Sequence, residues 1–406
     1  MQTKSKPKTK NKRWILPRHK IIVRLLAPIF FLWTRLKYHI HIEPCQELKK
    51  RQCLVIMNHQ TAFDQFFVSL ALYPRHIYFI ASEDLFSLGF LSKLLRWAVA
   101  PIPIKKQTTD VQAVMNCIRV AREGGTICLA PEGNRTFSGL PCYMNPAITP
   151  LVKKLGLPLA FFRIEGGYGI QPRWSDVCRK GSMRAYVSRI MEPEEYNSLS
   201  KEELGEVIRK ELFIDETKST QEFHHEKLAE YLERAMYVCP WCGMAEFRSE
   251  KDLITCKSCG KQIRYLPNQK LAGVGCDFPF PYVAQWYQYQ CDFINDFDTT
   301  QDIVKPLFRD TVTISTVEPY KRKILLQKDV PALLYGNRMQ VGELTLHFED
   351  INVVTVLGKN KLNIYHKDGL YQVKGTDPRF NGLKYMNIFF RHKNQLSDPD
   401  SRFLGI

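Results

Sequence analysis

The chain has 406 residues but no acidic residue before Glu43, whereas eleven lysines and arginines precede that position. The formal net charge is +17, so more than half of the excess lies in the first tenth of the chain. A basic arm of this kind attracts a polyanion, either nucleic acid or an anionic lipid surface. The plainer alternative is an unstructured, solubilising tail.

The chain also lacks a long uninterrupted apolar run near this arm. Residues 21–33 are mostly apolar, but Arg24 and Pro28 interrupt them, and a transmembrane helix needs about 20 apolar residues. No small-residue cleavage site follows, which argues against a signal peptide. The segment is typical of a retained interfacial anchor, whose expected aromatic edge consists of Trp14, Trp33 and Tyr38.

Two catalytic patterns are missing as well. No GxSxG elbow occurs, which disfavours a serine acyl-enzyme. No P-loop occurs, which argues against a nucleotide-driven ligase or kinase. Disulfide staples are not needed in a chain of this length, and four of the twelve cysteines form CxxC pairs suited to a metal. These features predict a reducing, cytoplasmic compartment.

Between about residues 52 and 189, short apolar runs alternate with helical stretches. Continuous apolar strands that alternate with helices predict an α/β fold whose sheet is covered by helices on both faces. The expected strands are Cys53–Met57, Ile77–Ala81, Thr126–Ala130, Leu159–Ile164 and Met183–Val187.

The composition changes along the chain and predicts four parts. These are a basic arm with an interfacial segment (1–45), the α/β domain (46–236), a cysteine-bearing module (237–267) and a β-rich domain (268–406). Residues 201–237 are expected to be helical because apolar residues recur on one face. Hairpin signals after residue 311 loosely resemble a pleckstrin-homology or GRAM-like domain, and a plain structural or dimerising domain is the alternative.

Two polar segments directly follow buried strands of the α/β part. Asn58, His59 and Asp64 follow the first strand, and Glu132-Gly133-Asn134-Arg135-Thr136 follows the third. Ligands bind at the carboxyl ends of such strands. An imidazole there can take a proton from a hydroxyl, and a carboxylate can fix its tautomer. Gly133 permits a tight turn close to a ligand, and Arg135 offers donors suited to phosphate. Alone, a histidine and an aspartate five residues apart are more often structural.

Together the segments resemble the NHxxxxD and EGTRS motifs of the glycerol-phosphate and lysophosphatidate acyltransferase family. The family's intermediate motif resembles Pro103-Ile104-Lys105-Lys106, with lysine in place of its arginine, and its fourth motif resembles Leu157–Phe162. Asn134 replaces the family's threonine. The resemblance covers roughly residues 24–189.

The resemblance implies roles for these residues. His59 would deprotonate the free hydroxyl of a lysophospholipid, and Asp64 would orient His59. The oxygen would attack the thioester of an acyl-CoA or an acyl-carrier protein directly. Substrate contacts, mainly to the acceptor's phosphate, are expected from Asn58, Lys105, Lys106, Glu132, Gly133, Asn134, Arg135 and Thr136. The most favoured acceptor is 1-acylglycerol-3-phosphate, at the cytoplasmic face of a membrane.

An apolar segment between the first two motifs runs from Leu85 to Trp97. A helix with such a stripe belongs to a core more often than it faces lipid. In an acyltransferase-like chain it could instead line an acyl-chain tunnel or enter the bilayer.

The paired cysteines are Cys239 with Cys242 and Cys256 with Cys259, thirteen residues apart. Two such knuckles suit a closed, structural zinc site, so we expect zinc without a catalytic role. A redox dithiol is the alternative. Because a zinc ribbon can bind nucleic acid, a scaffold with an inactive acyltransferase fold is the rival function, although the intact motif residues make nucleic acid an unlikely partner. An acyltransferase with another lipid acceptor is the nearer rival.

Overall fold

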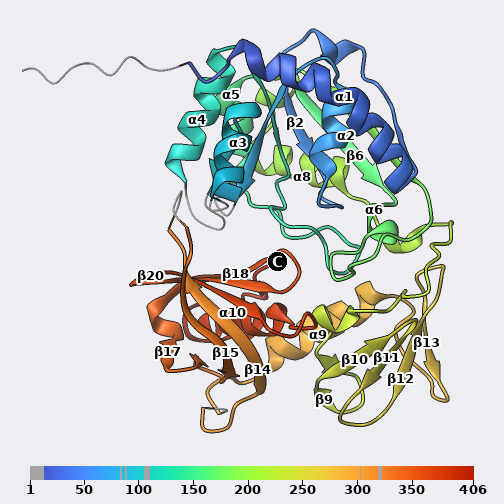
Figure 1. The fold of residues 1–406 in the computed structure, drawn as a ribbon, viewed down its shortest axis with the longest axis vertical. Coiled ribbons are helices and arrows are strands. Elements are labelled where there is room, and N and C mark those ends of the chain that lie inside the picture. Colours follow the sequence, from blue (N-terminus) through green and yellow to red (C-terminus); the bar gives the residue numbers. More distant parts are fainter. Residues whose placement is uncertain (1–12, 83–84, 87–88, 105–109, 302, 319–321) are drawn as a thin grey trace, which may run out of the picture.

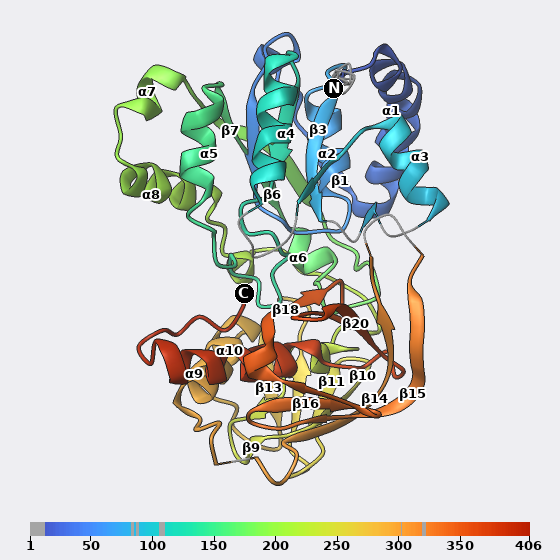
Figure 2. The same cartoon turned by 90° about the vertical axis from the view of Figure 1, so that its left-hand side faces the viewer.

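The computed structural model describes residues 13–82, 85–86, 89–104, 110–301, 303–318 and 322–406. An α/β layer with helices on both sides of its sheet stands above two β-rich modules (Figures 1 and 2). This arrangement confirms the predicted fold class.

A seven-stranded sheet forms the centre of the α/β layer, in the order β1-β7-β6-β2-β5-β3-β4. β2 is parallel to β5 and β6, and β3 is parallel to β4 and β5, whereas β7 is antiparallel to β6. Parallel strands align their carboxyl ends at one edge, where the predicted polar segments begin. The strands are Ile40–Ile42 (β1), Leu54–Met57 (β2), Ile77–Ser82 (β3), Ile102–Ile104 (β4), Thr126–Leu129 (β5), Leu159–Glu165 (β6) and Met183–Met191 (β7).

Side chains that alternate along β2 enter two separate cores. Val55 and Met57 pack with α1 and α2 on one face, whereas Leu54 and Ile56 pack with α4, α5 and α8 on the other. The period of two residues in a strand therefore explains why this short, fully buried strand is apolar throughout. The helices are Pro17–Tyr38 (α1), Asp64–Ala71 (α2), Phe90–Ala98 (α3), Val111–Arg122 (α4), Ile148–Leu155 (α5), Gly167–Ile170 (α6), Pro193–Asn197 (α7) and Lys201–Leu212 (α8).

The long helix expected over residues 201–237 is wrong beyond Leu212. Only two short 3-10 turns follow, at Glu216–Lys218 and Leu232–Arg234. Glu216 is buried and accepts a hydrogen bond from the amide of Gly166 at 2.9 Å, and buried Arg234 donates to the carbonyl of Trp174 at 2.8 Å. These tertiary bonds fix the segment in an irregular path that helical periodicity could not reveal.

The expected aromatic edge of α1 is only partly correct. Tyr38 is fully buried, and Trp33 packs edge-on against Phe63 with ring centroids 5.0 Å apart. The exposed apolar side chains of α1 are mainly aliphatic instead, with Phe31 as the aromatic one among them. No helix among the described residues is long and apolar enough to cross a membrane.

The cysteine-bearing module is a small antiparallel sheet, β10-β11-β12-β13, with a two-stranded knuckle, β8-β9. Its strands are Val238–Cys239 (β8), Gly243–Met244 (β9), Phe247–Glu250 (β10), Leu253–Cys256 (β11), Gln262–Tyr265 (β12) and Leu271–Val274 (β13). The aromatic segment that follows forms a helix, Val283–Asp296 (α9).

The C-terminal domain is an antiparallel sheet in the order β17-β16-β15-β14-β20-β19-β18. β14 and β20 are the first and last strands of this sheet along the chain, and they pair with each other at its centre. This pairing joins the meander β14–β17 to the meander β18–β20. A final helix, α10, packs on this sheet and was not expected from the sequence. The elements are Phe308–Thr316 (β14), Ile324–Leu334 (β15), Arg338–Val341 (β16), Leu344–His347 (β17), Ile351–Leu357 (β18), Lys361–His366 (β19), Gly369–Gly375 (β20) and Gly382–Ser397 (α10).

Candidate active site

The junction between β2 and α2 brings a histidine and an aspartate together. Nδ1 of His59 lies 2.8 Å from Oδ2 of Asp64. The Asp64 side chain has no exposed surface, whereas 27% of the His59 side chain is exposed. The imidazole therefore reaches the surface of the domain while its partner is held inside.

The hydrogen bonds to Asp64 determine which tautomer His59 adopts. The carboxylate accepts from the amide of Gln60 at 2.7 Å, and from the amide and hydroxyl of Thr61 at 2.9 and 2.7 Å. All three of these groups donate, so the carboxylate oxygens act as acceptors in this arrangement. Nδ1 of His59 must then carry the proton, which leaves the lone pair on Nε2, as general base catalysis requires.

Asn58 ties this junction to the neighbouring strand. Its amide nitrogen donates to the carbonyl of Ile164 in β6, and its amide oxygen accepts from the Ile164 amide, both at 2.8 Å. Asn58 is also almost fully buried. The role visible in these bonds is positional, and the substrate contact expected for Asn58 stays a prediction.

Glu132, after β5, connects the second segment to the first. Its buried carboxylate accepts from the amide of Cys142 at 2.9 Å and from the backbone amide of His59. Burial raises the pKa of Glu132 to about 7, against the lowering effect of these two bonds. The carboxyl thus links the loop after β5 to the backbone of the histidine.

Arg135 lies close enough to the dyad to interact with it electrostatically. Burial lowers the pKa of its guanidinium, and the charge of Asp64 opposes this effect. Nη1 of Arg135 is buried and has no hydrogen-bond partner among the described residues. A buried donor that lacks a partner is costly, so an anionic ligand at this position would relieve the cost.

The remaining residues of the second segment shape its turn. Gly133 has a φ of +63°, a conformation that glycine adopts without strain. The hydroxyl of Thr136 accepts from the amides of Ser138 and Gly139 at 3.1 and 2.9 Å, and Asn134 is buried. Gly133 and Thr136 thus fix the course of the loop that carries Arg135. Lys105 and Lys106 lie outside the described residues, directly after β4.

Comparisons with known proteins give a family match and a structural similarity. Residues 38–161 match the model of the family described as Acyltransferase. This part of the chain is an acyltransferase domain. The crystal structure of the 1-acyl-sn-glycerophosphate (LPA) acyltransferase PlsC from Thermotoga maritima is a structural match with 20% sequence identity and a TM-score of 0.42, over 48% of this chain and 78% of that chain. No curated protein sequence matches the chain.

Sequence reasoning missed a buried arginine beside the acyltransferase motifs. Nη1 of Arg173 donates to the carbonyl oxygen of Arg135 at 2.9 Å. Arg173 follows α6, in a loop with no recognisable pattern, and 38 residues separate it from Arg135. Only the folded structure brings the two together.

The four paired cysteines form one cluster outside the acyltransferase domain. The sulfurs of Cys239 and Cys259 are 3.7 Å apart, those of Cys242 and Cys256 are 3.6 Å apart, and all four lie within 4.8 Å of one another. Thiolates about 2.3 Å from a tetrahedral zinc have sulfur–sulfur edges of about 3.8 Å. The cluster therefore fits a metal of this kind, with every ligand supplied by the protein.

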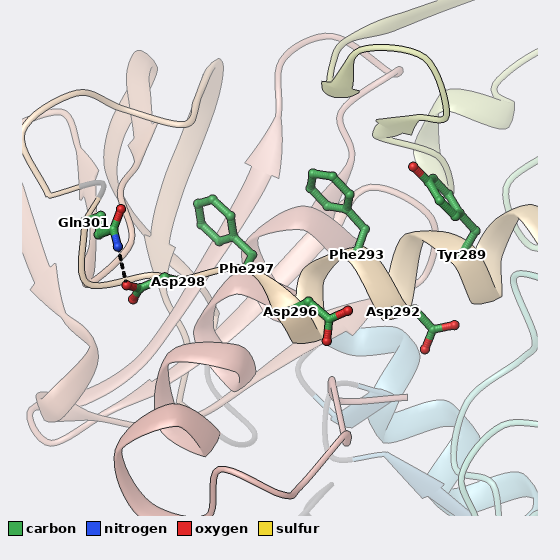
Figure 3. Close-up of a pocket in the computed structure, with 7 residues that line it drawn as sticks. All are labelled: Tyr289, Asp292, Phe293, Asp296, Phe297, Asp298 and Gln301. Carbon is green, nitrogen blue, oxygen red and sulfur yellow. Dashed lines mark hydrogen bonds between the residues drawn. The ribbon is translucent and has the colours of Figure 1, made fainter.

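A shallow hollow on α9 contains none of the predicted site residues (Figure 3). Three of its side chains, Asp292, Asp296 and Asp298, are acidic, and Gln301 donates to Asp298 at 2.8 Å. It has neither the histidine nor the buried arginine of the acyltransferase domain, so we do not assign the reaction to it.

Proposed function

We propose that the chain is a lipid acyltransferase that moves a fatty acyl group from a thioester to the free hydroxyl of a lysophospholipid. The observation that carries this proposal is the pair His59 and Asp64, in which a buried carboxylate lies 2.8 Å from Nδ1 of the imidazole. Its position within the residues that match the Acyltransferase family supports a role for His59 in the proton transfer.

The chemistry follows from the tautomer. Nε2 of His59 takes the proton of the acceptor hydroxyl as the oxygen attacks the thioester carbonyl. The carbon–sulfur bond then breaks, the new ester forms, and the imidazolium returns its proton to the departing thiolate. Asp64 stabilises the imidazolium between these two transfers. No acyl-enzyme is required, and acyl-CoA or acyl-carrier protein can serve as the donor.

The acceptor is proposed to be 1-acylglycerol-3-phosphate, which gives phosphatidate. The buried Nη1 of Arg135 supports a phosphate-bearing acceptor, because this donor has no partner among the described residues and lies near the dyad. Guanidinium binds phosphate strongly. Lys105 or Lys106, which follow β4 in the sequence, are proposed to assist, and Gly133 and Asn134 would shape the turn around the headgroup.

Membrane docking is proposed to occur through α1 and α3. The two helices are in contact, and Nε of Arg18 donates to the carbonyl of Trp97 at 3.0 Å. Both helices lie on the right-hand side in Figure 2. Their exposed apolar side chains, together with the basic residues before Glu43, suit the cytoplasmic face of an anionic membrane. These side chains are Ile21, Leu25, Leu26, Ile29, Phe31, Leu32 and Leu36 on α1, and Phe90, Leu91, Leu94 and Trp97 on α3.

The direct test is acyl transfer by the purified protein. Lysophosphatidate, lysophosphatidylcholine and other lysolipids are supplied with oleoyl-CoA or oleoyl-carrier protein, and the released thiol and the diacyl product are both measured. We expect transfer to lysophosphatidate and its loss in His59→Ala, while His347→Ala, at an exposed histidine of the C-terminal domain, retains it. Transfer by His59→Ala at the wild-type rate would refute the mechanism, and salt-sensitive binding to nucleic acid without transfer would favour the scaffold alternative.

A further inference from the structure

The hydrophobic core of the two C-terminal modules also includes side chains from the acyltransferase half of the chain. Phe137, two residues after Arg135, is 2% exposed, and Trp174, next to Arg173, is fully buried. Both belong to the same buried cluster as the cysteine-bearing module and the C-terminal sheet. The loop that carries Arg135 is therefore packed into the appended half of the chain.

Arg173 connects this loop to the C-terminal sheet. Its guanidinium is buried and donates to three carbonyl oxygens, each at 2.9 Å: Arg135 in the loop, Val356 in β18, and Gly358 in the turn after β18. It also lies 4.2 Å from the ring centroid of Phe137. One side chain thus fixes the backbone of the arginine loop against the β18–β19 hairpin.

Lys359, at the tip of the β18–β19 hairpin, makes a second connection. Its ammonium lies 2.8 Å from Oδ1 of Asp176, in the loop that also carries Arg173. Arg234 lies in the turn before the cysteine module. Its guanidinium donates to both oxygens of the Asp176 carboxylate, to Oδ1 at 2.8 Å and to Oδ2 at 3.0 Å. In Figures 1 and 2 the β18 edge of the sheet lies directly beneath the acyltransferase layer.

We propose that the C-terminal domain is a working part of the acceptor site, because its β18–β19 hairpin fixes the Arg135 loop through Arg173 and Lys359. The inference rests on the proposed function, since it takes Arg135 as the group that binds the acceptor's phosphate. Arg173 and Lys359 are positioning residues. They act through the backbone of the loop and through Asp176, without contact with the reacting atoms.

The charges in this region indicate the kind of headgroup that the site accepts. Burial lowers the pKa of Arg173 to about 9, and the charge of Arg135 adds to this effect. Burial also lowers the pKa of Lys359, with Asp176 opposing the shift and Arg135 contributing to it. Four cations, Arg135, Arg173, Lys359 and Arg234, lie in this region with the carboxylates of Asp176 and Asp64. Because the cations outnumber the carboxylates, a dianionic phosphomonoester would relieve more repulsion than a zwitterionic headgroup.

The experiment compares two lysines that each form an ion pair with an aspartate, one across the domain boundary and one within the C-terminal domain. Lys359 pairs with Asp176 across the domain boundary, whereas Lys367 pairs with Asp350 at 2.8 Å within the C-terminal sheet. The full-length variants Lys359→Met and Lys367→Met are assayed with lysophosphatidate and oleoyl-CoA. Hydrogen exchange of residues 131–137 is measured in parallel without substrate.

We expect Lys359→Met to raise the KM for lysophosphatidate about tenfold, with the KM for oleoyl-CoA unchanged, because a displaced binding group weakens only its own ligand. Exchange in residues 131–137 should rise as well. Lys359→Arg should restore both values, and Lys367→Met should alter neither. Equal acceptor KM and equal exchange in the two methionine variants would overturn the inference. If the wild-type protein shows no transferase activity, the proposed function is refuted. Faster hydrogen exchange of residues 131–137 in Lys359→Met would then still show that the β18–β19 hairpin fixes the Arg135 loop.

Discussion

Replacement of Asp64 by asparagine tests the dyad most directly. Four hydrogen bonds reach the carboxylate, from Nδ1 of His59, the Gln60 amide, and the amide and hydroxyl of Thr61. In Asp64→Asn the amide oxygen can keep the two bonds from Thr61. The new NH2 group would face the other two donors, His59 Nδ1–H and the Gln60 amide. His59 is then expected to adopt the other tautomer, with its proton on Nε2.

Two consequences of different size follow. The lost bond to the buried Gln60 amide and the unsatisfied NH2 group should lower the free energy of unfolding by about 2–4 kcal/mol. The wrong tautomer removes the general base, so kcat should fall by about 10³- to 10⁴-fold, or roughly 4–5.5 kcal/mol in activation free energy. The acceptor KM should change less than threefold, because Arg135 is not altered.

The assay is steady-state thiol release with both substrates saturating, at a temperature where thermal melting shows the variant to be folded. Asp215→Asn is the matched control. Asp215 accepts from the amide of Thr217 at 3.1 Å and from its hydroxyl at 2.5 Å, but it binds no histidine in the described structure. It should lose stability and keep its kcat. If Asp64→Asn retains more than a tenth of the wild-type kcat, Asp64 does not set the tautomer of His59.

Three further outcomes are expected. Elemental analysis of reduced protein should give about one zinc per chain, and Cys256→Ser should lose the metal and lower Tm, because structural zinc contributes folding energy. Metal-free protein with an unchanged Tm would contradict this. Burial lowers the pKa of His76 to about 4. As the pH falls, His76 is therefore protonated at a lower pH in the folded state than in the unfolded state. Up to about 3 kcal/mol of stability should be lost between pH 6.5 and 4. His76→Gln should reduce the fall in Tm over this range and exposed His347→Gln should not. Trp97, 52% exposed on α3, should be replaceable by glutamate without loss of Tm but with weaker sedimentation on anionic vesicles. Equal sedimentation would exclude α3 from the docking surface.

The exposure of α3 also corrects the core assignment favoured for the segment from Leu85 to Trp97. Phe90 is 80% exposed and Trp97 is 52% exposed, so the part of this stripe on α3 is not a core, whereas Phe86 before the helix is buried. A periodic pattern shows that a helix has an apolar face. The same pattern cannot show whether protein covers that face, because the covering elements come from elsewhere in the chain.

The sequence by itself determined the local features of this protein. Buried strands were predictable because β2 is apolar throughout, and because β5 and β6 contain apolar runs of three and four residues. The His59 and Asp64 pair was predictable because both residues lie in one short junction. The cysteine cluster was predictable for the same reason, since each knuckle needs only two intervening residues. In each case the interacting groups are close in sequence or follow the same kind of element.

Only the tertiary structure decided how the halves of the chain meet. It ended the helix at Leu212, because Glu216 and Arg234 bind backbone groups from distant loops. It placed Arg173 between the carbonyls of Arg135 and Gly358, which are more than 200 residues apart. Such contacts depend on which surfaces bury each other when the chain folds, and no periodicity or short motif records that choice.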